Sequence, residues 1–145
     1  MTEQEVLARD YFLKGCNCAQ AVFAAFCEQT GLDEQTALKL SSSFGGGMAR
    51  LREVCGAVSG AFMAAGLICG FAGDEPSEVK HAHYARLQAL AAEFKEKHGS
   101  LLCRELLSLH VDGKFAADVR AQEHPCTLFV MDAAALLMQS TQGEA

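Results

Sequence analysis

Apolar positions recur at helical spacing along most of the chain, and Gly, Pro and capping residues separate one such segment from the next. Between these breaks the chain is rich in Ala, Leu, Glu, Gln and Lys, which favour helices, and long alternating β-branched runs are absent. The clearest amphipathic segment starts at Pro76 and Ser77 and ends at Gly99, with Leu87 and Phe94 on its apolar face. The pattern predicts an all-α, single-domain helical bundle of about six to seven helices.

Capping residues set the expected boundaries of these helices. Asn17 and Gln20 form the pattern of a capping box, and Pro125 suits the first position of the last helix. The predicted helices are 3–14, 17–31, 33–40, 53–71, 77–99, 100–107 and 125–139, with a Ser/Gly loop over 41–47 and a loop with a helical turn over 110–123. No linker or repeat divides them, so we expect residues 1–145 to form one four-cysteine domain.

Residues 54–73 form an uncharged run of 20 residues, which is long enough to span a bilayer. Gly56, Gly60 and Ala64 repeat every four residues and form a smooth face for close helix packing. A buried helix of a globular bundle is also apolar on all sides. We therefore expect a buried, Gly/Ala-rich central helix and no membrane insertion.

Charge and cysteine content narrow the function classes. The net charge of −6 argues against nonspecific binding to nucleic acid or to an anionic membrane. The 7 cysteines are an odd number, which excludes a fully paired disulfide scaffold unless one thiol pairs between chains. The first ten residues lack the pattern of a signal peptide, so we expect a cytoplasmic protein. In that reducing compartment clustered cysteines more often serve metal or redox chemistry than crosslinking.

The cysteines fall into two kinds. Cys27 and Cys69 lie inside predicted helices among apolar neighbours, which favours a role as small core residues. Cys16 lies just outside a helix and could join or stand in for Cys18. Four others each fall in the first turn of a different predicted helix: Cys18, Cys55, Cys103 and Cys126.

A helix N-terminus stabilises a thiolate, because unsatisfied N–H groups and the positive end of the dipole lie there. Such a position lowers the pKa of a thiol from about 8.5, and the thiolate is the form that attacks, oxidises or binds metal. Four such sulfurs suffice for a four-cysteine metal site. The sequence contains no C-x-x-C motif, and some cysteines of a helical chain also fall at helix starts by chance.

Five short motifs together resemble one known family. They are residues 17–20 (NCAQ), 45–48 (GGGM), 55–60 (CGAVSG), 94–107 (FKEKHGSLLCRELL) and 124–126 (HPC). In combination they resemble the CGAxxG (C_GCAxxG_C_C) family, whose members are described as redox-active. The resemblance covers about residues 10–140 and implies a small domain defined by four cysteines. Those four map onto Cys18, Cys55, Cys103 and Cys126, and the other three cysteines match no motif position.

An iron–sulfur cluster is the first chemistry that we expect at such a site. Several helix N-termini would face the anionic cluster with N–H donors, which raises its reduction potential. The glycine loop adds backbone N–H groups that can approach sulfur closely, and Arg50 or Arg52 adds positive charge. We therefore predict a four-cysteine iron–sulfur centre for electron transfer, with Gly45, Gly46, Gly47 and Arg50 as further cofactor-binding residues.

Three alternatives stay open. Zinc is one, although four cysteines spread over most of the chain match the closely spaced pairs of structural zinc sites less well. Thiol–disulfide exchange without metal would use the same cysteines, with Cys18 attacking and Cys55 or Cys16 resolving. An interaction module without redox chemistry would dimerise through the face of Gly56 and Gly60. The sequence names no redox partner.

The histidines add one candidate. His83 shares the apolar face of its helix and is expected in the core. His124 lies two residues before Cys126, so we expect it to support that cysteine by a hydrogen bond.

Overall fold

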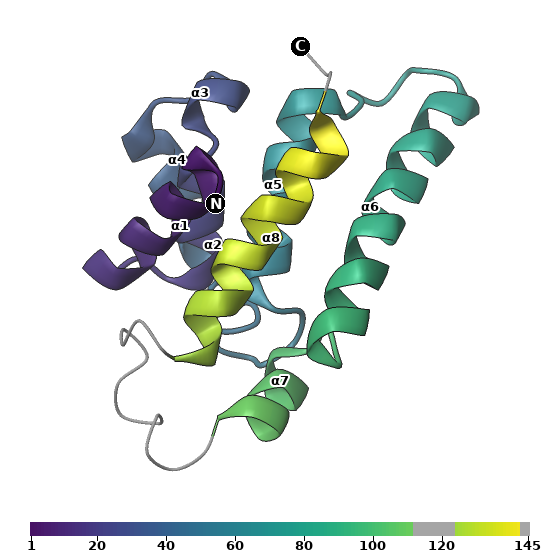
Figure 1. Ribbon diagram of the computed structural model, residues 1–145. Helices are drawn as coiled ribbons and strands as arrows, with labels where there is room; N and C mark the ends of the chain where they lie inside the picture. The colour runs from purple at the N-terminus through teal and green to yellow at the C-terminus, as the bar shows by residue number, and fades with distance from the viewer. Residues whose placement is uncertain (112–123, 143–145) are drawn as a thin grey trace.

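The computed structural model describes residues 1–111 and 124–142 and is an all-α domain, as the sequence predicts (Figure 1). The elements of this part of the chain are α1 (Glu3–Lys14), α2 (Cys18–Ala24), α3 (Cys27–Thr30), α4 (Glu34–Ser41), the 3-10 turn η1 (Ser42–Phe44), α5 (Gly56–Cys69), α6 (Ser77–His98), α7 (Cys103–His110) and α8 (Pro125–Thr141). The predicted loop over 110–123 lies outside the described residues except for His110, which ends α7, and residue 111.

Local capping begins and ends several helices where the sequence predicts. Asn17 accepts a hydrogen bond from the N–H of Gln20, whose side chain accepts from the N–H of Asn17 in return. Asp33 accepts the N–H of Thr36 at the start of α4. Gly99 ends α6 in the left-handed conformation. Because these caps join residues only three or four positions apart, sequence patterns detect them.

Several predicted helix boundaries are wrong, and tertiary contacts explain three of the differences. The helix predicted over residues 17–31 is divided into α2 and α3. At the break the N–H of Phe26 bonds to the carbonyl of Phe23, and the Phe26 ring is fully buried. Residues 53–55 are not helical, because the chain there pairs with residues 101–103. For the same reason α7 begins at Cys103 and not at Ser100.

Helix α5 is the Gly/Ala-rich central helix, and it packs against α2, α8 and α6. A Cβ atom on Gly60 would lie 2.6 Å from the carbonyl oxygen of Ala19, so only glycine permits this approach to α2. The face of Gly56 and Gly60 is thus occupied by α2 of the same chain. A dimer, one of the alternatives that the sequence leaves open, would therefore have to use another surface.

Helices α1, α6 and α8 complete the bundle around α5 and α2 (Figure 1). The largest fully buried side chains include Phe12 of α1, Phe94 of α6 and Leu137 of α8. His83 is buried as expected, with its ring edge-on to Phe71 at 5.8 Å between centroids. Within residues 1–111 and 124–142, no helix is both long enough and apolar enough to span a membrane.

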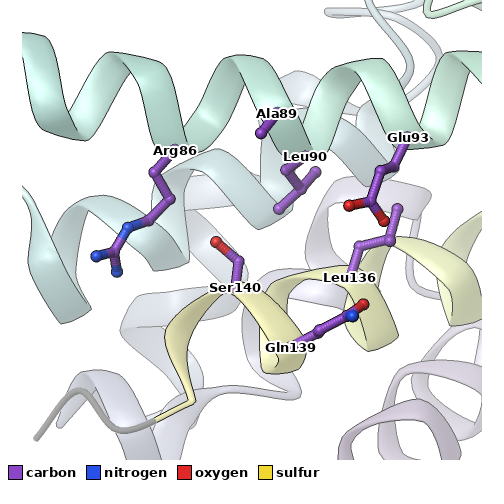
Figure 2. A pocket seen from close by; sticks show the side chains of 7 residues that line it. All are labelled: Arg86, Ala89, Leu90, Glu93, Leu136, Gln139 and Ser140. Atoms are coloured by element: carbon purple, nitrogen blue, oxygen red, sulfur yellow. The ribbon is translucent and has the colours of Figure 1, made fainter.

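A cleft of about 270 Å³ lies between α6 and α8 (Figure 2). Arg86 and Glu93 of α6 lie at its two ends, Gln139 and Ser140 of α8 line the opposite side, and Leu90 is at its base. None of the cysteines lines this cleft. The cleft is therefore separate from the cysteine site.

Candidate functional site

Four cysteines lie at the starts of four helices, as the sequence predicts. Cys18 is the first residue of α2, Cys103 is the first residue of α7, and Cys126 follows Pro125 at the start of α8. Cys55 is the N-cap of α5. In Figure 1, α5 and α8 both rise from the lower end of the molecule, where α7 also lies. The helix starts thus meet at one end of the bundle.

An isolated antiparallel bridge brings Cys55 and Cys103 together. Val54 pairs with Leu102, the N–H of Cys55 donates to the carbonyl of Leu101 at 2.7 Å, and the N–H of Cys103 donates to Glu53 at 2.6 Å. The two cysteines are 48 positions apart in the sequence. Only this long-range pairing makes them neighbours.

Close helix packing brings Cys18 to the same place. A Cβ atom on Gly56 would lie 3.2 Å from the Cβ of Cys18, so the start of α5 abuts the start of α2. The Cys126 side chain in turn hydrogen bonds to that of Cys18. We call Cys18, Cys55, Cys103 and Cys126 the four-thiol cluster.

The members of the four-thiol cluster influence one another electrostatically. The hydrogen bond to Cys18 raises the pKa of Cys126, and burial and the charges of the other three thiols raise it further. Burial, followed by the charge of Cys18, raises the pKa of Cys55. The N–H groups of Ala57 and Val58 oppose this rise but do not outweigh it. The expectation that helix starts lower these pKa values is therefore wrong for Cys55, where burial dominates, and for Cys126, where the hydrogen bond to Cys18 and burial dominate.

An arginine contacts the cluster directly. Nη1 of Arg52 donates to Sγ of Cys103 at 3.6 Å. Arg104 holds the Arg52 segment in place, since its Nη1 donates to the Arg52 carbonyl at 3.1 Å and lies 3.4 Å from Oε1 of Glu53. Among the described contacts it is thus Arg52, not Arg50, that reaches a thiol. The sequence offered both arginines, and only the fold distinguishes them.

The loop before α5 coils in the left-handed sense. Five consecutive residues have positive φ: Gly46 (66°), Gly47 (75°), Met48 (70°), Ala49 (49°) and Arg50 (61°). For residues other than glycine this conformation costs roughly 1–2 kcal/mol each. Backbone strain of this kind persists where the surrounding structure enforces it, which is common at functional sites.

The glycines of this loop serve close packing. A Cβ atom on Gly47 would lie 2.7 Å from the Cβ of Cys103 and 2.7 Å from the backbone nitrogen of Glu53. A Cβ atom on Gly45 would overlap the side chain of Asn17, the cap of α2. The predicted proximity of the glycine loop to a cysteine therefore holds for Gly47, whose backbone lies against Cys103.

His124 supports Cys126, as the sequence suggests. It is fully buried, caps α8, and accepts the backbone N–H of Cys126 on Nδ1 at 3.0 Å. The bond reaches the backbone of Cys126 and not its sulfur. His124 therefore positions the residue.

The remaining three cysteines interact with other groups. Cys16 and Cys27 are electrostatic neighbours of Tyr11, whose hydroxyl donates to Glu34 at 2.6 Å. Cys69, at the end of α5, donates to the Ala65 carbonyl at 3.3 Å. Cys27 and Cys69 are half-buried and not fully buried as the sequence predicts, although Cys27 packs against the hydrophobic core.

In the part of the chain that the structure describes, no group of three or more His, Cys, Asp or Glu side chains has a geometry that could hold a metal ion. The four-thiol cluster nevertheless has the chemical character of a ligand set, because thiolates bind zinc and iron–sulfur clusters. The four thiols therefore match a zinc ion or an iron–sulfur cluster in the type of their donor atoms.

Comparison with known proteins gives one match. The family model described as "Putative redox-active protein (C_GCAxxG_C_C)" matches residues 16–140. No curated protein and no solved structure matches the chain. The matched residues include all four members of the cluster and the loop that packs on them. Since the match spans most of the sequence, this chain belongs to the C_GCAxxG_C_C family.

Proposed function

We propose that this protein carries electrons through an iron–sulfur cluster that would be held by Cys18, Cys55, Cys103 and Cys126. The observation that supports the proposal most is the convergence of four different helix starts, which the pairing of Val54 with Leu102 and the close approach of α5 to α2 bring to one end of the bundle. One-electron transfer is the chemistry that such a cluster supplies when bound. The cytoplasm is the compartment that we propose, because it keeps thiols reduced.

The electrostatics of the site favour a cationic occupant. Several thiolates close together repel one another, which is one reason why the pKa values of Cys55 and Cys126 are raised. Iron cations would offset that repulsion. Donors to sulfur at Cys55 (the N–H groups of Ala57 and Val58) and at Cys103 (Arg52) would raise a reduction potential.

Thiol–disulfide exchange is the second candidate, and the hydrogen bond between the Cys126 and Cys18 side chains favours it. Oxidation would form a bond between the two sulfurs and release two protons and two electrons to an acceptor. This chemistry needs no metal and uses two members of the same cluster.

Anaerobic purification, followed by an absorption spectrum and by iron, zinc and sulfide analysis on one sample, separates these functions. We expect coloured protein with iron and acid-labile sulfide, and we expect Cys103→Ser to remove both. Cys27→Ser is the matched control and should leave them unchanged. Stoichiometric zinc without colour would replace the cluster by a zinc site on the same four cysteines. Metal-free protein after anaerobic reconstitution would contradict both and leave the disulfide chemistry.

A further inference from the structure

A positively charged and partly apolar surface lies beside Cys103. Three of its residues are arginines and three are exposed apolar side chains. We call it the arginine face: Met48, Arg50, Leu51, Arg52, Val54 and Arg104.

The contacts of the arginine face tie it to the four-thiol cluster. Arg52 donates to Sγ of Cys103, and Arg104 donates to the carbonyl of Arg52. Val54 pairs with Leu102, directly between Cys55 and Cys103. A protein that covers this face would therefore lie next to the thiols.

The sign of the charge on this face is opposite to that of the whole chain. The chain has a net charge of −6, yet three arginines gather here. Among nearby acids, Glu53 lies 3.4 Å from Arg104, and Glu105 accepts a hydrogen bond from Ser100. The face keeps a local excess of positive charge, which would attract and orient an acidic surface.

Three apolar side chains are exposed within the same seven residues: Met48 (47%), Leu51 (65%) and Val54 (40%). The left-handed coil of residues 46–50 forms the first part of this segment, at a cost in backbone strain. Arg and Met are enriched in protein–protein interfaces, where apolar contacts form the centre and charges form the rim. A small polyanion would make little use of the apolar side chains.

From these observations we infer that the arginine face is the docking surface for an acidic electron-transfer protein. The inference rests on the proposed redox function and names the class of partner that the four-thiol cluster serves. Apolar contact with Leu51 would fix the complex, and Arg50, Arg52 and Arg104 would steer its approach.

An oxidised flavodoxin, a small acidic FMN protein, is the probe for this inference. Its binding to the protein as purified is measured by calorimetry, and amide shifts in NMR spectra locate the contact. We expect shifts at Met48, Leu51 and Arg104, and a weaker affinity as the salt concentration rises. The double variant Arg50→Glu/Leu51→Asp should raise the Kd at least about tenfold.

Val79→Asp/Lys80→Glu is the matched control. It makes the same change in net charge and also removes an exposed apolar residue, but it lies at the start of α6, at the opposite end of the bundle (Figure 1). We expect less than about a twofold change in Kd from this control, because distant exposed charges are screened. Equal losses of affinity in both double variants, or no binding by the unmodified protein, would overturn the inference.

Two further measurements, of the oligomeric state and of the iron content, also test the inference. If the protein alone is a dimer that Leu51→Asp dissociates, the face binds a second copy and the inference is overturned. Calorimetry and NMR detect binding whether or not electrons are transferred. Iron analysis of the same sample therefore tests the proposed cluster independently of docking. Docking without iron would contradict only the proposed cluster, and iron without docking would contradict only this inference.

Discussion

Helix α5 has a cysteine at each end, and the two differ in burial and in the groups that surround the thiol. Cys55, the N-cap, is 4% exposed, receives N–H groups from Ala57 and Val58, and lies among three other thiols. Cys69, the last residue, is half-buried, donates to the Ala65 carbonyl, and accepts from Nη1 of Arg86 at 3.2 Å. The same side chain thus meets donors and other thiols at one end and a helix carbonyl and one guanidinium at the other.

The comparison shows that position on a helix does not by itself determine a thiol's chemistry. The start of α5 should favour a thiolate at Cys55. Burial and the charge of Cys18 nevertheless raise the pKa of Cys55. The effect of burial and of the neighbouring thiols therefore outweighs the effect of the helix dipole on the pKa of Cys55. A cysteine at a helix start belongs to a candidate redox site here because the starts of several helices meet.

The largest difference between the two ends should appear in cofactor content. Cys55→Ser removes a member of the cluster, so we expect complete loss of iron and colour. Cys69→Ser should keep both, because the hydrogen bonds of the Cys69 thiol are to α5 and α6 at the other end of the helix. Iron analysis and absorption spectra of the two variants measure this. The opposite pattern would reject the cluster assignment.

The second largest difference should appear in the rates at which Cys55 and Cys69 are alkylated in the metal-free, reduced protein. The thiolate is the reactive form, and burial together with the charge of Cys18 raises the pKa of Cys55. At about pH 8 we expect iodoacetamide to modify Cys69 at least about tenfold faster than Cys55, and the modification of Cys55 should accelerate as the pH rises. Peptide mapping by mass spectrometry gives both rates. Equal alkylation rates of Cys55 and Cys69 at that pH would show that the Cys55 thiol is not buried and that its pKa is not raised.

Two glycines of α5 should respond in opposite directions to alanine. Gly60→Ala places a Cβ atom 2.6 Å from the Ala19 carbonyl oxygen and should destabilise the protein by about 1–3 kcal/mol. A Cβ atom on Gly66 meets nothing within 4 Å, so Gly66→Ala should stabilise by about 0.5–1 kcal/mol. Urea unfolding of both variants gives the two free energies. Similar values would mean that α2 does not approach α5 as closely as described.

The smallest expected effect concerns the two arginines that donate to sulfur. Arg52→Gln removes a donor and a positive charge at Cys103 and should lower the reduction potential by roughly tens of mV, since one hydrogen bond is worth about 1 kcal/mol. Arg86→Gln makes the same change at Cys69 and should leave the potential unchanged. Anaerobic redox titration checks the pair. An equal shift in both would show that Arg52 acts only through net charge.

Several features of the fold follow from patterns within a few residues. The capping box of Asn17 and Gln20, the Asp33 cap and the end of α6 at Gly99 all involve neighbours in sequence. The four cysteines at helix starts are recognisable for the same reason. Sequence patterns miss the break at Phe26, which depends on burial of its ring in the core.

The site itself required the fold. The left-handed coil over residues 46–50 has glycine at only two of five positions, so composition does not indicate it. Arg52 could not be chosen over Arg50, because its contact with Cys103 spans 51 positions. The raised pKa values of Cys55 and Cys126 likewise depend on thiols from other helices.

By itself the sequence determined the helical class, the family, and which cysteines begin helices, because spacing, caps and motifs are local properties of the chain. The tertiary structure alone decided that these cysteines meet, which arginine reaches them, and that burial and neighbouring thiols raise the pKa of Cys55 and Cys126. Those properties depend on distances between segments far apart in sequence, such as the pairing of Val54 with Leu102. Distances of that kind arise only when the central helix packs against its neighbours.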